Sequence, residues 1–247
     1  MTRTRVVFIT GGARGIGRAF ADALVADGVR VALADADLDA ARSASADLGA
    51  ERAFGVRCDV GDEASVDQAV KSTVDHFGGI DILINNAARH LMAWSQPVTE
   101  ISTQGWRDIL DVNVLGIVNC ARACRPHLRD SGTGCILNIS SVSGFTSVDV
   151  YGITKLAVRG LTVALAKELA VDGVRVNCLA PGPMDTEAAV ADLPESLVRG
   201  FIEDKQLIKR QGRVADLVGA MRFFTSAASS FVTGETLVIG GGFPLRV

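Results

Sequence analysis

Tyr151 and Lys155 are the two side chains whose types and spacing most directly suggest chemistry. They stand four positions apart in the segment YGITK, and Tyr151 is the only tyrosine of the chain. The surrounding segment, residues 151–170, has the apolar spacing of a helix, so residues four apart share a face. Because a neighbouring ammonium favours the phenolate, we expect Lys155 to lower the pKa of Tyr151 from its usual value of about 10. The phenol would then donate and accept a proton, unless the two residues form only a surface pair.

A glycine-rich segment, TGGARGIG at residues 10–17, is a second candidate for chemistry. It follows the apolar run VVFIT and precedes AFADALVA, which has helical spacing. Glycines at such a turn let a ligand approach the backbone closely, and amides at the helix start can bind a pyrophosphate. Glycine-rich turns also occur for packing alone. The position directly after the first strand favours a dinucleotide site.

Asp35 closes the apolar run RVALAD, twenty residues beyond Gly15. An acid at this place can accept hydrogen bonds from the adenosine ribose hydroxyls and would repel a 2′-phosphate. Asp35 could also cap the helix that begins near Leu38. Arg14 favours NADP instead, because a cation in the glycine loop could hold a 2′-phosphate. We give the acid more weight and predict NAD as the cofactor, with NADP less favoured.

The elements that must position these residues alternate along the chain. Short β-branched runs lie at residues 5–10, 30–35, 53–59, 80–85, 134–140, 173–179 and 235–240, with helical segments between the early ones. Strands separated by helices pair in parallel, and runs that are apolar throughout indicate helices on both faces of a sheet. We therefore predict an α/β, doubly wound Rossmann-type fold of about seven parallel strands.

The sequence contains no charge block, linker or repeat that marks a domain boundary, so one domain is expected over residues 1–247. One irregular region, residues 181–206, has prolines and acids that interrupt weak helical patterning. Long segments of this kind are usually functional. We predict a small substrate lid at roughly residues 183–206.

Composition limits the partners of the protein. Apolar residues make up 48% and charged residues 21% of the chain, with a net charge of −3, which gives no reason to bind nucleic acid or anionic membranes. No apolar run is long enough to span a bilayer, and the N-terminus lacks the pattern of a signal peptide. A cytoplasmic protein with a small-molecule substrate is expected.

The cysteines and histidines suggest structure rather than metal binding. The five cysteines, at positions 58, 120, 124, 135 and 178, form no C-x-x-C pair and lie in apolar segments. They are expected to be small buried side chains in a reducing compartment. His76, His90 and His127 share no ligand spacing, so no metal site is predicted.

Taken together, these segments resemble the classical short-chain dehydrogenase/reductase family over essentially the whole chain. Residues 10–17 match its T-G-x-x-x-G-x-G motif and residues 151–155 match Y-x-x-x-K. Asn85, Asn86 and Ala87 match the N-N-A element, and Pro181 and Gly182 match the P-G turn. Such a resemblance implies a nicotinamide-dependent oxidoreductase with hydride transfer.

The resemblance assigns four catalytic residues. Tyr151 would exchange a proton with the substrate oxygen, and Ser141 would hydrogen-bond that oxygen. Lys155 would lower the pKa of Tyr151 and bind the nicotinamide ribose, and Asn113 would help to hold a water that relays protons through Lys155. Asn113 could instead only satisfy helix backbone.

The resemblance also implies a set of cofactor contacts. Asp59 and Val60 would border the adenine, unless Asp59 only caps the next helix, and Thr186 would meet the nicotinamide amide from the lid. The full set is Gly11, Arg14, Gly15, Ile16, Gly17, Asp35, Asp59, Val60, Asn86, Ala87, Tyr151, Lys155, Pro181, Gly182 and Thr186.

The segments that the family uses as pocket walls are mostly apolar here. They contribute Leu91, Met92, Trp94, Phe145, Val148, Met184 and Val190, from which Ser141, Phe145, Trp94 and Met184 are predicted to bind substrate. Residues 185–204 carry six acids against one arginine, which disfavours an anionic substrate. Arg89 and His90 could offset this. We predict a neutral, largely hydrophobic secondary alcohol or its ketone.

Three departures from the family pattern are present. Ala88 replaces a usual glycine, and Gly240 replaces a common acid. Ser141 precedes Tyr151 by ten residues, about three fewer than the family usually has, so Ser143 could compete for the serine role. The chain length is sufficient, since ten residues can span roughly 30 Å.

Two other functions are left open by the sequence. An NADPH-dependent carbonyl reductase, for example on 3-oxoacyl thioesters, is favoured by Arg14 and opposed by Asp35. A non-catalytic dinucleotide-binding protein on the same fold is opposed by the complete Ser, Tyr, Lys and Asn set. The resemblance further implies a homo-oligomer, a homotetramer or a homodimer, paired through the helices that contain Asn113 and Tyr151.

Overall fold

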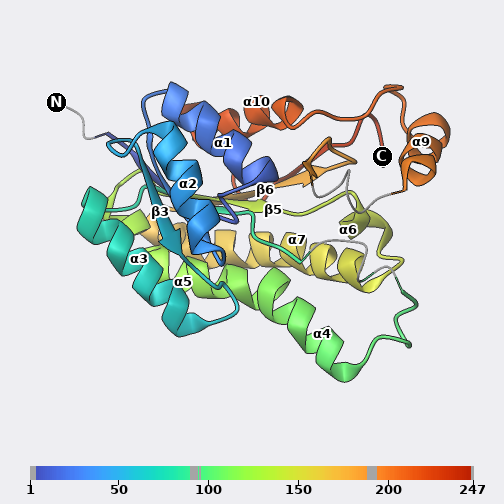
Figure 1. Ribbon diagram of the computed structural model, residues 1–247, viewed down its shortest axis with the longest axis horizontal. Helices are drawn as coiled ribbons and strands as arrows, with labels where there is room; N and C mark the ends of the chain where they lie inside the picture. The colour runs from blue at the N-terminus through green and yellow to red at the C-terminus, as the bar shows by residue number, and fades with distance from the viewer. Residues whose placement is uncertain (1–3, 90–93, 95, 188–193, 246–247) are drawn as a thin grey trace.

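The computed structural model describes residues 4–89, 94, 96–187 and 194–245 of the chain. Within these residues, seven parallel strands form one sheet in the order β3-β2-β1-β4-β5-β6-β7 (Figure 1). The strands are β1 (Val6–Thr10), β2 (Arg30–Asp35), β3 (Ala53–Arg57), β4 (Ile82–Asn85), β5 (Cys135–Ile139), β6 (Arg175–Pro181) and β7 (Thr236–Ile239). The predicted number and direction of strands are confirmed.

Helices cover both faces of this sheet, with α1 and α10 on one side and α3, α5 and α7 on the other (Figure 1). The helices are α1 (Gly15–Ala26), α2 (Leu38–Leu48), α3 (Glu63–Phe77), α4 (Thr103–Leu110), α5 (Gly116–Asp130), α6 (Ser143–Thr146), α7 (Val150–Glu168), α9 (Glu195–Asp204) and α10 (Ala215–Phe224). A π-helical segment, Asp111–Leu115, joins α4 to α5. The predicted α/β, doubly wound Rossmann-type fold is therefore confirmed.

Two apolar clusters fill the layers between the sheet and its helices. On one face, Phe20 and Leu24 of α1 pack with Leu217 and Met221 of α10. On the other face, side chains of α3, α5 and α7 cover the sheet, including Val66, Ile117 and Val158. Burial of apolar area on both faces explains why the strands are apolar throughout and do not alternate.

The strand order reverses direction between β1 and β4, which makes this pair the topological switch point of the sheet. From β1 the chain continues to β2 on one side, and β4 pairs with the other side of β1. Thr10 and Asn85, the last residues of these strands, are partners in the parallel register. Ligands of doubly wound folds bind at such a switch point, outside the carboxyl ends of the strands. The glycine loop directly follows the end of β1, and Asn86 directly follows the end of β4.

Polar residues at helix starts fix where the chain leaves each loop. Asp37, Asp62 and Ser102 accept backbone hydrogen bonds from the first turns of α2, α3 and α4. Asp149 does the same for α7, because its Oδ1 accepts a hydrogen bond from the Gly152 amide at 2.6 Å. Caps of this kind stabilise a helix by about 1 kcal/mol. The cap on α7 sets the position of Tyr151, one residue into the helix.

All five cysteines are free and buried, with exposed fractions of 3% or less, as predicted. In the part of the chain that the structure describes, no helix combines the length and apolar character needed to cross a membrane. Among the same residues, no three His, Cys, Asp or Glu side chains are grouped so that they could hold a metal ion.

Candidate active site

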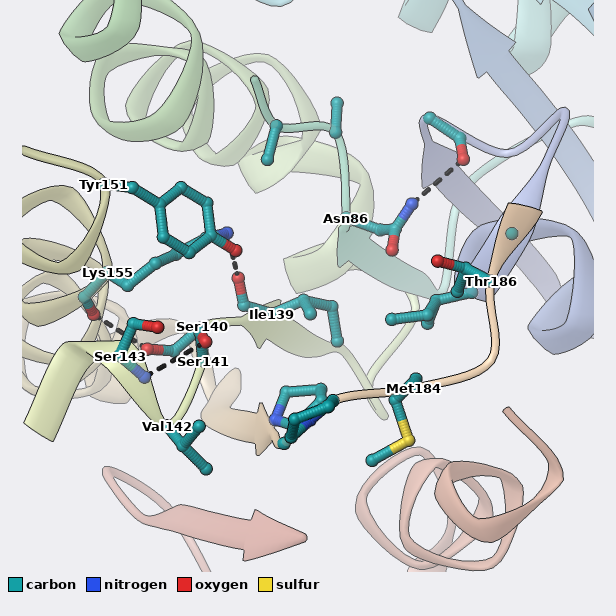
Figure 2. A pocket seen from close by; sticks show the side chains of 18 of the residues that line it. Asn86, Ile139, Ser140, Ser141, Val142, Ser143, Tyr151, Lys155, Met184 and Thr186 are labelled. Carbon is teal, nitrogen blue, oxygen red and sulfur yellow. Dashed lines mark hydrogen bonds between the residues drawn. The ribbon is translucent and has the colours of Figure 1, made fainter. Parts of the chain in front are cut away.

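A cavity of about 630 Å³ lies at the carboxyl ends of β1, β4, β5 and β6. Figure 2 shows Tyr151, Lys155 and Ser141 at one end of it and Asn86 and Thr186 at the other. The lining residues are Gly11, Arg14, Gly15, Ile16, Asn86, Ala87, Ala88, Ile139, Ser140, Ser141, Val142, Ser143, Tyr151, Lys155, Pro181, Gly182, Pro183, Met184, Thr186, Glu187, Val198 and Phe201. Most of the residues predicted from the sequence therefore share one cavity.

The glycine loop is held by the residues that follow β4. The Asn86 Nδ2 donates hydrogen bonds to the carbonyl oxygens of Thr10 at 3.1 Å and of Gly11 at 2.9 Å. The amides of Asn86 and Ala87 donate to the Thr10 Oγ1 at 3.0 and 3.1 Å. The N-N-A element thus orients the loop.

Three glycines of the loop have distinct structural reasons. Gly11 and Gly15 have φ values of +60° and +55°, a region that side chains other than glycine rarely adopt. Gly17 is buried, and a Cβ there would lie 2.2 Å from the Gly11 carbonyl oxygen. A Cβ on Gly15 would approach only Thr186, at 3.8 Å across the cavity. At Gly11 and Gly15 the loop therefore presents backbone without a side chain to the cavity.

The start of α1 can hold an anion. Gly15 and Ile16 form its first turn and line the cavity. The residue before the helix, Arg14, makes no side-chain hydrogen bond to the first turn. Amide groups at a helix start carry partial positive charge and bind phosphates. The binding of a dinucleotide pyrophosphate by these amides stays a prediction.

Two acids lie at the end of β2. The Asp35 carboxylate accepts hydrogen bonds from the amides of Ala13 at 3.3 Å and Asp37 at 3.2 Å. Asp37, and not Asp35, caps α2, through a hydrogen bond from the Ala40 amide. The guanidinium of Arg14 pairs with Asp37 at 2.7 Å. The cation that the sequence left in doubt is therefore paired with a carboxylate in this structure.

Tyr151 and Lys155 face the cavity from α7. The Lys155 Nζ lies 5.5 Å from the centroid of the Tyr151 ring and donates a hydrogen bond to the Ile139 carbonyl oxygen at 2.9 Å. The Ser140 Oγ donates to the backbone oxygen of Lys155 at 2.7 Å. These bonds tie α7 to the end of β5. The side chain of Lys155 is only 3% exposed.

The electrostatics of this pair differ from the expectation. Burial raises the pKa of Tyr151 to about 12, a hydrogen bond with Ser141 partly offsets this rise, and Asp149 adds to it. Burial also lowers the pKa of Lys155 to about 8. The predicted lowering of the Tyr151 pKa is wrong for the chain itself, because removal from water raises this pKa by more than the hydrogen bond with Ser141 lowers it. At neutral pH the phenol is protonated and can donate its proton to a carbonyl oxygen.

Ser141 is the serine that contacts Tyr151, through the hydrogen bond between their side chains. The Ser141 Oγ also accepts a hydrogen bond from the Ser143 amide at 3.1 Å. Both serines line the cavity (Figure 2). The contact with Tyr151 favours Ser141 over Ser143 for the serine role, which stays a prediction.

The short segment between Ser141 and Tyr151 packs tightly on α7. A Cβ on Gly144 would lie 2.7 Å from the Lys155 carbonyl carbon. Arg159 donates a hydrogen bond to the Gly144 carbonyl oxygen at 2.8 Å, and its guanidinium lies 3.6 Å from the centroid of the Phe145 ring. Phe145 therefore packs against Arg159 and is not among the cavity-lining residues.

Asn113 lies in the π-helical segment and is 1% exposed. Its Oδ1 accepts a hydrogen bond from the Arg89 amide at 2.8 Å, and its Nδ2 donates to the Thr154 Oγ1 at 3.1 Å. Thr154 in turn donates to the backbone oxygen of Tyr151 at 2.7 Å. In this structure Asn113 links the segment after β4 to the start of α7, and these hydrogen bonds go to the Arg89 backbone and the Thr154 side chain, not to helix backbone as the alternative expected. Its role in holding a water stays a prediction.

Other predicted residues lie outside the lining of this cavity. Asp59 accepts a hydrogen bond from the Gly61 amide, and Val60 is buried against Gly116. The lining also omits Gly17, Asp35, Asn113, Phe145, Trp94 and Val148, of which Val148 is 79% exposed. His90, Leu91, Met92 and Val190 fall outside the described residues. The predicted roles of Asp59 and Val60 at the adenine stay predictions.

Several lining residues were not predicted from the sequence. Val198 and Phe201 reach the cavity from α9, and their spacing of three residues on one helix face was the available signal. Ile139 and Val142 flank the predicted serine on the end of β5. Glu187 is the acid of the lid that lines the cavity among the described residues.

Comparisons with known proteins find dehydrogenases and reductases that match over nearly the whole chain. A family model described as enoyl-(acyl carrier protein) reductase matches residues 11–244. Sorbitol dehydrogenase of Cereibacter sphaeroides is 37% identical, with 96% of both chains covered. L-fucose dehydrogenase of Oryctolagus cuniculus is 38% identical, covering 98% of this chain and 85% of the relative. A solved 3-ketoacyl-(acyl-carrier-protein) reductase from Brucella melitensis, complexed with NADH, has a TM-score of 0.89 and 30% identity, with 99% of this chain and 100% of that chain covered.

Proposed function

Because the chain belongs to the short-chain dehydrogenase/reductase family, and so is an oxidoreductase, we propose that it interconverts a neutral secondary alcohol and its ketone with NAD. The observation that carries this proposal is the shared cavity of Ser141, Tyr151, Lys155 and the glycine loop. These residues supply a proton donor, a hydrogen bond for the substrate oxygen and a phosphate-binding backbone in one place.

The residues of the chain have separable tasks. Ser141 holds the substrate oxygen against Tyr151, which donates its proton to that oxygen in reduction and takes it back in oxidation. Lys155 holds the pocket end of α7 to β5 and places a cation beside the phenol. Gly11, Gly15 and Asn86 form the cradle for the dinucleotide. When bound, the nicotinamide would exchange a hydride with the substrate carbon that carries the oxygen, giving the hydride in reduction and accepting it in oxidation.

The substrate side of the cavity supports an uncharged compound. Ile139, Val142, Met184, Val198 and Phe201 give it apolar walls. Glu187 adds a negative charge at the lid, which disfavours a carboxylate or phosphate. The relatives named for sorbitol and L-fucose take their names from uncharged hydroxyl compounds, in agreement with this inference.

The deciding experiment compares matched alcohols. NADH formation is measured with 1-phenylethanol and with mandelate, which replaces the methyl group by a carboxylate, and with sorbitol and cyclohexanol. We expect a higher kcat/KM for 1-phenylethanol than for mandelate. A clear preference for mandelate would contradict the neutral substrate, and no turnover of any compound in either direction would favour a non-catalytic binding protein.

A reductase of 3-oxoacyl thioesters is the second candidate. It is favoured by the structural likeness to a 3-ketoacyl-(acyl-carrier-protein) reductase and by the raised pKa of Tyr151, which keeps the phenol protonated. Adding an acetoacetyl thioester and acetophenone, the ketone of 1-phenylethanol, to the same panel, with NADH and with NADPH, separates the two functions. Faster reduction of the thioester than of acetophenone would favour the second candidate.

Asp35→Ser is expected to shift the cofactor preference from NAD toward NADP. The change removes the carboxylate that would bind the ribose hydroxyls and repel a 2′-phosphate. Since a hydrogen bond to a charged group contributes about 1.5 to 3 kcal/mol, the ratio of kcat/KM values should move about 10- to 100-fold. The control is Asp39→Asn, which removes an acid in the first turn of α2, the helix that follows β2. A wild-type preference for NADP would contradict the cofactor assignment.

A further inference from the structure

The lid helix α9 (Glu195–Asp204) is held by the segment that follows the last strand. This segment, residues 240–244, is called the C-terminal turn below. In Figure 1 the C-terminal end of the chain lies beside α9. The ring of Phe243 meets the ring of Phe201 edge to face, with centroids 4.9 Å apart and an interplanar angle of 83°. Phe201 thus contacts the C-terminal turn and also lines the cavity.

Charge and backbone contacts reinforce this pair. The Lys205 Nζ lies 5.8 Å from the centroids of both rings, a distance at which a cation is attracted to an aromatic face. The amides of Leu207 and Ile208 both donate to the Gly241 carbonyl oxygen, at 2.8 and 2.9 Å. The C-terminal turn therefore fixes the chain directly after α9.

The buried side chain of Gln206 also stabilises the chain directly after α9. Its side chain is 3% exposed, and its Nε2 donates to the carbonyl oxygens of Ile208 and Arg210, both at 2.9 Å. A Cβ on Gly241 would lie 2.8 Å from this Nε2. The close fit between Gln206 and Gly241 leaves the end of the lid little freedom to shift.

The C-terminal turn also touches Gly182, the residue that follows β6. The Gly182 amide donates to the Ile239 carbonyl oxygen at 2.9 Å. A Cβ on Gly182 would lie 2.9 Å from the Gly240 Cα, so the two backbones are in direct contact. Gly182 lines the cavity. The C-terminal turn therefore contacts both the chain directly after α9 and the cavity-lining Gly182 at the end of β6.

From these contacts we propose that Phe243 is a positioning residue that sets the place of α9, and with it the substrate wall formed by Val198 and Phe201. The part of this proposal that concerns substrate rests on the proposed function. Phe243 does not line the cavity and acts through Phe201. Its effect should fall on the binding of substrate, because the glycine loop and Tyr151 belong to other elements.

The first test is hydrogen exchange of the full chain, which needs no substrate. Phe243→Ala should speed the exchange of the amides of α9 about tenfold, because an aromatic pair is removed, and leave α10 unchanged. The matched control is Leu245→Ala, since Leu245 lies two residues further along and is 74% exposed. Unchanged exchange of α9 would overturn the proposal. If exchange rises throughout the chain, Phe243→Leu, which keeps an apolar side chain, is judged by the same criterion.

The second test is the split between KM and kcat with the best alcohol of the panel above. Phe243→Ala should raise the KM of the alcohol about five- to tenfold and change kcat and the KM of NAD less than twofold. Phe243→Tyr should restore the wild-type KM, because it keeps the ring. Faster exchange of α9 with an unchanged KM would overturn the role in substrate binding. If the panel gives no substrate, the proposed function fails, while the exchange experiment still decides whether Phe243 holds α9.

Discussion

Tyr151→Phe is expected to lower kcat about 10²- to 10⁴-fold, the usual contribution of a positioned proton donor and acceptor. The change removes one hydroxyl and keeps the ring, which is packed beside the Lys155 ammonium. Since the phenol of Tyr151 is protonated at neutral pH, it is the group placed to give a proton to the substrate oxygen. Turnover is measured with the best alcohol and ketone of the panel.

The control for this variant is cofactor binding and stability. Tyr151→Phe should bind NADH as the wild type does, by fluorescence titration, and unfold at a similar temperature. Ser143→Ala serves as a matched loss of a hydroxyl that also lines the cavity, and it should retain most of the activity. A kcat near the wild-type value in Tyr151→Phe would refute the catalytic assignment.

Gly17→Ala is expected to cause a second large loss, in this case of cofactor binding. The added Cβ would lie 2.2 Å from the Gly11 carbonyl oxygen and 2.7 Å from the Asn86 Nδ2. Because the first of these is backbone, the glycine loop must move, which should cost about 2 to 3 kcal/mol of stability. Displacement of the Gly15 and Ile16 amides, which we propose to bind the pyrophosphate, should raise the dissociation constant of NADH by about 100-fold or more, measured by titration calorimetry.

Gly219→Ala is the matched control. Gly219 lies within α10, where an added Cβ would meet no atom within 4 Å. The same substitution there should leave NADH binding unchanged and should stabilise the helix by up to about 1 kcal/mol. Equal NADH binding by Gly17→Ala and Gly219→Ala would contradict the assigned role of the glycine loop.

The fold could be predicted from the sequence because the strands are buried on both faces and therefore apolar throughout. The ends of the strands were less certain. The predicted strand at 53–59 ends at Arg57, whereas β6 continues to Pro181. Proline has no amide to donate, but its carbonyl oxygen accepts a hydrogen bond from the Val142 amide, so the extension is stable. Tertiary pairing of this kind leaves no local signal.

The site was predicted in its motifs and not in its environment. The spacing of Tyr151 and Lys155 on one helix is local, so the sequence contains it. The pKa of Tyr151 depends on how far residues distant in sequence exclude water from it, which no spacing encodes. Phe145 was predicted to bind substrate because it lies in a segment that the family uses as a pocket wall, but Arg159, fourteen residues later, packs on its ring. The π-helical turn that holds Asn113 likewise follows from packing.

Three predictions from the sequence, on assembly, cellular location and domain extent, are not tested by the structure. The homotetramer or homodimer and the cytoplasmic location stay predictions. The extent of the domain over residues 1–247 also stays a prediction. Leu156 and Val163 on α7 are 46% and 43% exposed, as a helix that pairs with another subunit would require. A mass measurement in solution is the direct way to examine that assembly.

The burial of every cysteine has a practical meaning for labelling chemistry. Cys58, Cys120, Cys124, Cys135 and Cys178 all lie in the two apolar clusters. Burial also raises the pKa of Cys135 and Cys178 to about 11, so the reactive thiolate is scarce as well as inaccessible. The native cysteines therefore need not be replaced before a labelling experiment, because the folded protein should not react with thiol reagents. A single cysteine introduced on α9 would then be the only site that takes up a fluorescent or spin label. Reaction of the unaltered protein with a thiol reagent would measure the fraction of molecules that have unfolded.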